Sequence, residues 1–269
     1  MRRYCELLAS GTTKLVEPVS SALVQQVPDI ADAADALVPG RASASVLKGR
    51  ALLKLGRAAD ALAAFDEAKR RDDRALDEPV ALLAWARANA RAGRLAEAVK
   101  AYRAALPRTS ALTTAERSSA SFEAGMAVMA QGPAGVDDAV AMFRQARRDA
   151  QDSIQVASVM ALALALDRAG QRDEARAVLA GRSRADIKAL LDTRVSDALS
   201  DAGVRHESDA LVAIALEGDG PVAAKDAWRA YLDGAGGKGP WAAHAREHAG
   251  SVAASKKPGA KVLQVGGNR

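Results

Sequence analysis

The chain contains 269 residues, of which 49% are hydrophobic, 26% are charged and 3% are aromatic. This length and apolar content suffice for the core of one large domain or two ordinary ones, and they exclude a chain that is disordered throughout. The formal net charge of +5 is too small by itself to indicate a nucleic-acid-binding surface. A single cysteine excludes a fold held by internal disulfides. No apolar run approaches the roughly 18 residues of a membrane-spanning helix.

The first residues carry only part of the pattern of an export signal. The basic start Met1–Tyr4 is followed by polar residues between Thr12 and Glu17, which interrupt the apolar stretch that a secretory signal needs. The residues before Cys5 also lack the small, apolar character of a lipidation site. We therefore expect a cytoplasmic protein, with a periplasmic or envelope-associated location as the alternative.

Residues 41–183 repeat a pattern of two apolar helical stretches joined by a turn. An alanine near the start of each second stretch recurs at intervals of 36 to 41 residues. A recurrent internal period of this length indicates a helical repeat array. We predict four hairpins in this region, marked by the alanines Ala61, Ala98, Ala139 and Ala175.

Helix packing explains why these residue types recur. In the first three hairpins an aromatic residue follows the alanine by four positions, so that both lie on one face of the second helix. A small residue on the first helix lets the second helix approach closely, and the ring fills the remaining space. A glycine is expected to end each first helix; these glycines are Gly56, Gly93, Gly132 and Gly170.

In these residues the chain resembles the tetratricopeptide repeat family, whose second helix carries the pattern A-x3-[FY]-x2-A. The fourth hairpin departs from this pattern, with Leu179 in place of the aromatic residue. The resemblance covers roughly residues 43–180 and implies an all-α, right-handed superhelical solenoid of hairpins. A HEAT-like array is the nearest alternative, because its period of about 40 to 47 residues brackets the longest interval. Three triplets match in full: Ala61-Phe65-Ala68, Ala98-Tyr102-Ala105 and Ala139-Phe143-Ala146.

The flanks are helical in pattern but do not follow the repeat. We predict N-terminal capping helices in residues 1–40, because terminal units of repeat arrays are atypical and polar on their outer face. Residues 184–254 are predicted to form degenerate hairpins and a capping helix that starts at Pro240. Residues 255–269 carry four positive charges and no acid, and we predict a flexible basic tail.

Chemical motifs are few, and one matches a metal-binding pattern. The run from His244 to His248 reads H-x-x-E-H, in which two histidines one helical turn apart can bind zinc. Such a site needs a third protein ligand, and no Asp, Glu, His or Cys follows His248, although an upstream acid can in principle serve. We interpret the two histidines as surface residues on a terminal helix. The sequence therefore predicts no metal, no cofactor and no active site.

The family resemblance places a candidate binding groove on the concave face, which is lined by the first helix of each hairpin. Its N-terminal half would be basic and suited to carboxylates, and its C-terminal half would be apolar and adaptable because of its methionines. The alternative is that the apolar residues are plain core and the basic ones an ordinary solvated face. The candidate groove residues are Arg50, Lys54, Arg87, Arg91, Phe122, Met126, Met129, Met160 and Leu164.

From these features we expect a non-catalytic scaffold or adaptor that binds a protein or peptide segment with acidic and apolar residues. Reversing the charges of Arg87 and Arg91 is expected to abolish capture of the partner without loss of helicity. Two alternatives stay open, a nucleic-acid-binding repeat protein and an envelope-associated scaffold for a secretion, pilus or motility apparatus. The small number of aromatic residues argues against nucleic acid. Hairpin stacking between copies of the chain, which would give homo-oligomers, is a further alternative.

Overall fold

The computed structural model describes residues 21–37, 39–149, 152–181, 193–217 and 220–254. All regular secondary structure in these residues is helical. The basic N-terminal start, Cys5 and the predicted basic tail lie outside the described residues. The helices are α2 (Ser21–Leu37), α3 (Ala42–Lys54), α4 (Ala58–Arg71), α5 (Pro79–Arg91), α6 (Leu95–Ala105), α7 (Thr114–Ala130), α8 (Val136–Asp149), α9 (Asp152–Arg168), α10 (Arg172–Leu179), α12 (Thr193–Asp201), α13 (Glu207–Leu216), α14 (Pro221–Asp233) and α15 (Ala242–Ala254).

Successive helices pack in pairs, α3 with α4, α5 with α6, α7 with α8, and α9 with α10. The predicted turn glycines lie between the two helices of each pair and have positive φ angles of 76° to 113°. In the first, second and fourth pairs the residue after the glycine donates its N–H to the carbonyl five residues back, as Arg57 does to Leu52 at 2.9 Å. This bond closes a Schellman-type helix end, which requires the left-handed conformation that glycine adopts without strain. Each predicted turn glycine therefore lies between two helices that pack against each other.

The helices of a pair approach closely where a small residue faces an aromatic ring. A Cβ atom added to Gly49 of α3 would lie 2.8 Å from the ring of Phe65 on α4. The same atom on Gly125 of α7 would lie 2.6 Å from the ring of Phe143 on α8. Both rings are fully buried. The close approach predicted from the A-x3-[FY] pattern is thus present in the first and third pairs.

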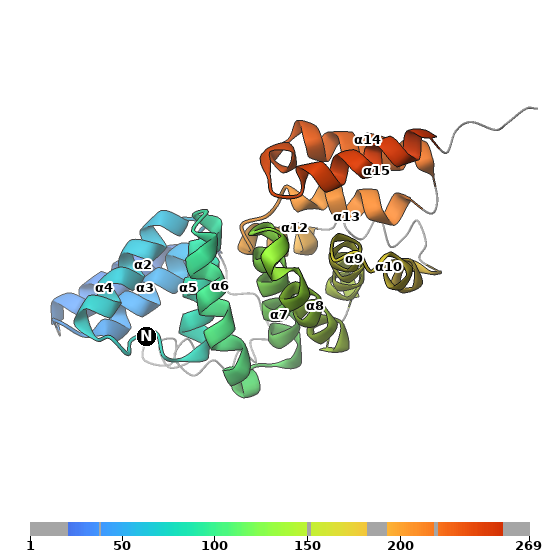
Figure 1. Ribbon diagram of the computed structural model, residues 1–269. Helices are drawn as coiled ribbons and strands as arrows, with labels where there is room; N and C mark the ends of the chain where they lie inside the picture. Colours follow the sequence, from blue (N-terminus) through green and yellow to red (C-terminus); the bar gives the residue numbers. More distant parts are fainter. Residues whose placement is uncertain (1–20, 38, 150–151, 182–192, 218–219, 255–269) are drawn as a thin grey trace, which may run out of the picture.

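The pairs stack along the chain, because α4 contacts α5, α6 contacts α7 and α8 contacts α9. Figure 1 shows this succession from α2 at one end to α9 and α10 at the other. At the N-terminal end α2 packs against α3, where Lys48 pairs with Asp32 at 2.6 Å. Arg71 of α4 also pairs with Asp35 of α2. None of the helices in the described residues is both long enough and apolar enough to cross a membrane.

The next described helix after the fourth pair, α12, returns to the earlier helices. Helix α12 contacts α5, α7 and α9, the first helices of three successive pairs. We call the surface that these three helices present to α12 the first-helix face. At the end of α12 the backbone of Gly203 lies so close to α5 that an added Cβ would stand 2.0 Å from the carbonyl oxygen of Ala90.

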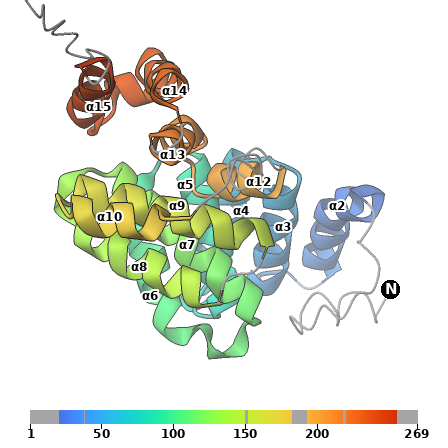
Figure 2. The same ribbon diagram turned by 90° about the vertical axis from the view of Figure 1, so that its right-hand side faces the viewer.

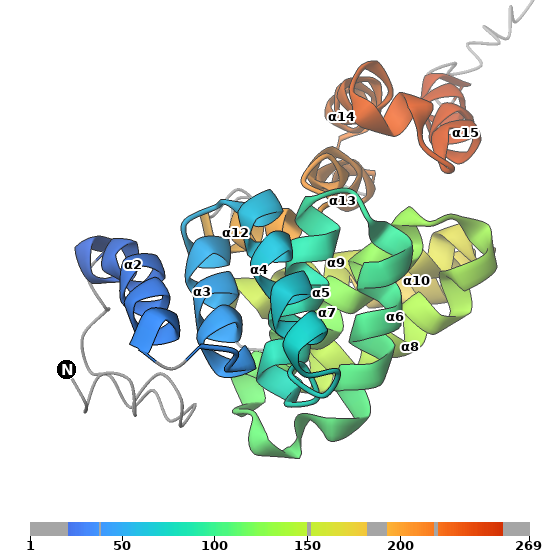
Figure 3. The ribbon, with the colours of Figure 1, turned by 90° about the vertical axis from the view of Figure 1, so that its left-hand side faces the viewer.

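The last three helices lie beside the C-terminal end of the array. Helix α13 contacts α9, α14 packs on α13, and α15 packs on α14. Figures 2 and 3 show α14 and α15 standing off from the array, with α13 between them and it. The indole N–H of Trp241 reaches back to α7 and donates to the carbonyl of Met129 at 2.6 Å. Polar contacts therefore join the last helices to the array.

Candidate functional site

The apolar half of the predicted groove is part of the protein core. Its five residues, on α7 and α9, are all 0% exposed and belong to one large apolar cluster. Val195 and Leu199 of α12 belong to the same cluster and are buried as well. The alternative interpretation, plain core, therefore describes these residues in this structure, because neighbouring helices and α12 exclude solvent from them. They are Phe122, Met126, Met129, Met160 and Leu164.

Arg87 was predicted to bind a carboxylate of a partner. In the structure it binds a carboxylate of the chain itself. Its Nε and Nη2 donate to Oε2 and Oε1 of Glu123 at 2.7 and 3.0 Å. Glu123 lies on α7 and is 2% exposed, and the hydroxyl of Tyr102 donates to it at 3.3 Å. The planar guanidinium matches both carboxylate oxygens at once. Arg87 thus ties the second pair of helices to the third.

Arg91 connects α5 to two other segments. Its Nη1 donates to the carbonyl of Leu53 on α3 at 2.8 Å, and its Nη2 pairs with Asp201 at the end of α12. Arg50 is half-buried, whereas Lys54 is exposed. Of the four basic residues predicted to line the groove, Arg87 and Arg91 therefore carry intramolecular ion pairs.

Helix α12 has the chemistry that was predicted for a partner of this groove. Its apolar side, formed by Val195, Ala198 and Leu199, is 0 to 7% exposed. Its acidic residue Asp201 binds a predicted groove arginine. The sequence shows an apolar stripe in this segment but does not show which surface it covers. Helix α12, a segment of the chain itself, thus lies against α5, α7 and α9, the helices that carry most of the predicted groove residues.

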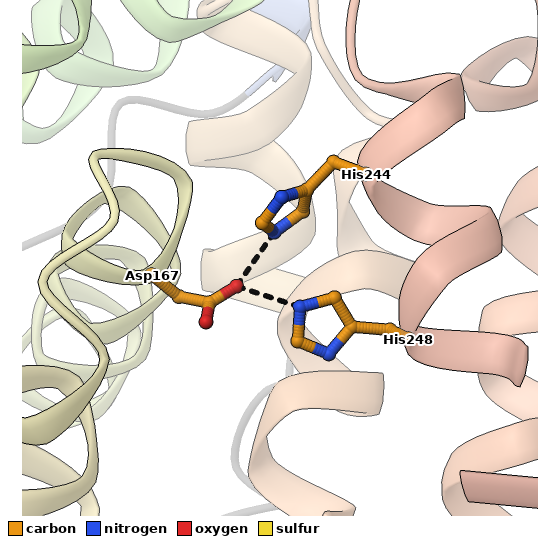
Figure 4. A group of neighbouring side chains, drawn as sticks. All are labelled: Asp167, His244 and His248. Carbon is orange, nitrogen blue, oxygen red and sulfur yellow. Dashed lines mark hydrogen bonds and ion pairs between the residues drawn. The ribbon is translucent and has the colours of Figure 1, made fainter. Parts of the chain in front are cut away.

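A second cluster of functional side chains lies between α9 and α15 (Figure 4). Asp167 comes from α9, and His244 and His248 come from successive turns of α15. Nε2 of His244 and Nε2 of His248 lie 2.6 and 2.8 Å from the same oxygen, Oδ2 of Asp167. One potential ligand atom from each of the three residues lies within 4.8 Å of the others. This set of two imidazoles and one carboxylate can hold a metal ion.

Further groups orient His248 from the opposite side of its ring. Its Nδ1 lies 2.6 Å from Oε1 of Glu217, the residue that follows α13, and the indole N–H of Trp228 donates to that oxygen at 2.8 Å. Burial alone would lower the pKa of His248, but its contacts with Asp167 and Glu217 raise this pKa to about 9. Burial alone would raise the pKa of Asp167, but the two histidines hold it well below its usual value.

The cluster is shielded but remains in contact with the surface. The side chains of Asp167, His244 and His248 are 6, 16 and 11% exposed. The ring of Trp228 lies 5.1 Å from that of His248, and the ring of Trp241 lies 6.1 Å from that of His244. The expectation that these histidines are surface residues is therefore wrong. They are held against an acid 77 residues upstream of His244, a distance in sequence at which no motif reveals the contact.

A buried ionic network lies next to this cluster. Arg168, the neighbour of Asp167, pairs with Glu207 of α13 at 3.0 Å, and the two side chains are 0 and 2% exposed. The hydroxyl of Tyr231 donates to Glu207 at 3.1 Å. The guanidinium of Arg168 also lies 4.7 Å from the ring centre of Trp241. These contacts join α9 to α13, α14 and the start of α15.

Comparison with known proteins finds no family model and no curated protein that match this chain. The resemblance to tetratricopeptide repeats therefore rests on the motifs in the sequence.

Proposed function

We propose that this protein is a non-catalytic interaction scaffold whose first-helix face binds a helical segment with acidic and apolar residues. The observation that carries the proposal is the seat of α12 on α5, α7 and α9. A surface that already holds one short amphipathic helix is suited to a second helix of the same character. The tetratricopeptide-like organisation and its right-handed superhelical course belong to this proposal as well.

The contacts of α12 define what a partner must offer. Val195 and Leu199, four residues apart, are 0 and 1% exposed, which gives a partner helix two apolar anchors on one face. Asp201 pairs with Arg91, which calls for a carboxylate near the end of the bound helix. Because Arg87 is already paired with Glu123, it contributes to the stability of the array more than to recognition.

In this proposal α12 and the partner compete for one surface. A partner gains access when α12 leaves the first-helix face, so that its apparent affinity is reduced by the fraction of molecules in which α12 is bound. Helix α12 is nine residues long, and an isolated helix of this length is marginal in water. Its hold on the face therefore depends on the packing of its apolar side.

The experiment displaces α12 from the first-helix face by mutation and then adds the α12 sequence as a separate peptide. The variant Val195→Asp/Leu199→Asp removes both apolar anchors, and a fluorescent peptide with residues 193–204 serves as the ligand. We expect the peptide to bind this variant at least about ten-fold more tightly than the wild type, in which α12 covers the face. Fluorescence anisotropy measures the two affinities. Asp197→Asn, a change at an exposed position of α12, is the matched control and is expected to behave as the wild type.

Two outcomes argue against the proposal. One is a folded Val195→Asp/Leu199→Asp variant, with helical circular dichroism, that binds the peptide no better than the wild type. The other is equal binding of a peptide that itself carries both aspartates, because a surface that recognises an amphipathic helix must reject one without apolar anchors. If the variant binds the peptide as expected, it can be used to capture partners from cells. A partner that binds the first-helix face must then be displaced by the unlabelled peptide.

A further inference from the structure

We propose that Asp167, His244 and His248 form a binding site for one divalent transition-metal ion, with Zn²⁺ as the best-fitting metal, which ties α15 to α9. The site does not include residues of α12, and it joins Asp167 of the array to two residues of the last helix. In this role the ion acts as a structural cross-link between two parts of the chain that are distant in sequence.

The geometry of the three side chains supports a single ion between them. Both Nε2 atoms point at the same carboxylate oxygen, and the two imidazole ring centres are 4.7 Å apart (Figure 4). Metal–ligand distances of about 2.0 to 2.2 Å in a tetrahedral site place ligand atoms about 3.3 to 3.6 Å apart. The present separations from Oδ2 of Asp167 are 2.6 and 2.8 Å, so side-chain rotations that open the cluster by less than an ångström admit the ion.

The surroundings of His248 have the form of an outer shell around a metal ligand. Histidine ligands usually donate their second ring N–H to a carboxylate, which fixes the ring and leaves the other nitrogen for the metal. Glu217 takes this position on Nδ1 of His248 at 2.6 Å, and Trp228 in turn holds Glu217 at 2.8 Å. This arrangement aims Nε2 of His248 at the shared position beside Asp167.

The types of ligand select the class of metal. Two imidazoles and one carboxylate suit Zn²⁺ and neighbouring transition metals, whereas Ca²⁺ and Mg²⁺ prefer sites made entirely of oxygen. Histidine and carboxylate side chains bind a metal ion in their deprotonated forms. Three protein ligands leave the fourth position of a tetrahedral site to water, which is the ligand number of catalytic zinc sites, so the structural assignment rests on the position of Glu247.

The position of Glu247 favours a structural site over a hydrolytic one. In the H-x-x-E-H motif of metalloproteases the glutamate stands beside the metal-bound water as general base. Here the side chain of Glu247 is 69% exposed, and its carboxylate lies 4.0 Å from Arg172. It is also absent from the group of potential ligands. The cluster instead lies where the last helix meets the array, so that a bound ion fixes their mutual position.

The test titrates the metal-depleted full chain with Zn²⁺ by isothermal calorimetry, with Mg²⁺ as the negative probe. We expect one Zn²⁺ per chain at a dissociation constant of micromolar or below, and no measurable Mg²⁺ binding. Asp167→Asn and His248→Gln are expected to weaken Zn²⁺ binding at least 100-fold, and Glu217→Gln about 10-fold. His206→Gln changes a histidine outside the cluster and is expected to leave the affinity unchanged. Circular dichroism checks that each variant is folded.

A measurement on the wild type alone covers variants that fail to fold. Diethyl pyrocarbonate modifies accessible imidazoles, and mass spectrometry locates the modified residues. Zn²⁺ is expected to slow modification of His244 and His248 at least ten-fold and to leave His206 unaffected. The proposal is overturned if Zn²⁺ does not bind the wild type, if folded Asp167→Asn binds it equally well, or if Zn²⁺ leaves His244 and His248 as reactive as before.

Discussion

Arg87 and Glu123 form a two-point ion pair between adjacent helix pairs, with donor–acceptor distances of 2.7 and 3.0 Å. Glu123 is 2% exposed, and its second contact comes from the buried hydroxyl of Tyr102. Arg87, which the sequence places in a binding groove, therefore connects two adjacent helix pairs inside the array. This relationship changes the expected effect of reversing its charge.

The Arg87→Glu substitution is expected to destabilise the fold strongly. It sets a second carboxylate against the buried Glu123, and breaking a buried pair in this way costs about 3 to 5 kcal/mol. Urea denaturation followed by circular dichroism measures the loss. Lys54→Glu, at an exposed position on α3, is the control and should change stability by less than about 0.5 kcal/mol. Equal stability of Arg87→Glu and Lys54→Glu would contradict the pairing of Arg87 with the buried Glu123. It would instead agree with the expectation from the sequence that charge reversal at Arg87 leaves the helicity unchanged.

Close packing at Gly125 predicts that even a methyl group is harmful there. Alanine gains about 1 kcal/mol over glycine in a helix, but overpacking of a buried contact costs about 1 to 3 kcal/mol. Because the added Cβ would lie 2.6 Å from the ring of Phe143, we expect Gly125→Ala to be net destabilising in thermal unfolding. Gly250→Ala in α15 meets no atom within 4 Å and is expected to be neutral or stabilising. A stabilised Gly125→Ala variant would show that the ring moves aside freely.

The ion pairs of Arg168 and Arg144 should differ widely in their contribution to the free energy of unfolding. Glu207→Ala leaves the guanidinium of Arg168 buried without its carboxylate, at a cost of about 3 to 5 kcal/mol. Glu174→Ala removes the partner of Arg144, where the two side chains are 47 and 51% exposed, and about 0 to 1 kcal/mol is expected. Chemical denaturation of both variants gives the comparison. Similar losses at the two sites would mean that solvent reaches Arg168.

Zinc binding between α9 and α15 predicts a thermal shift. A ligand at 100 times its dissociation constant stabilises the folded state by about 2.7 kcal/mol, which corresponds to a rise in melting temperature of about 5 to 10 °C for a chain of this size. Differential scanning calorimetry with and without Zn²⁺ measures this rise. The same metal should leave the melting temperature of Asp167→Asn unchanged, and an equal rise in that variant would place the ion elsewhere.

The hairpins could be predicted from the sequence because their signals are local. Gly56, Gly93 and Gly170 each end a helix through a left-handed residue, and such a turn depends on a few neighbouring residues only. The pairing of Gly125 with Phe143 likewise follows from the repeat pattern. These features require no knowledge of distant parts of the chain.

The candidate sites could not be predicted, because both depend on contacts between distant segments. Met126 and Met160 have the same helical spacing whether they line a groove or fill a core, and the positions of α12 and the neighbouring helices decide between the two. Val195 and Leu199 indicate that α12 buries one side but do not identify the surface it meets. Asp167 lies 77 residues before His244, so the third member of the H-x-x-E-H cluster has no signal in the motif itself.

The packing of α12 against the first-helix face is most directly tested by a double-mutant cycle on the ion pair between Asp201 of α12 and Arg91 of α5. The free energies of unfolding are measured for the wild type, Arg91→Gln, Asp201→Asn and the double variant, with the exposed pair Arg57 and Asp60 as the control cycle. The account predicts a coupling energy of at least about 1 kcal/mol between Arg91 and Asp201, and about 0.5 kcal/mol or less in the control. Additive effects of Arg91→Gln and Asp201→Asn would contradict the placement of α12 and, with it, the proposed binding face.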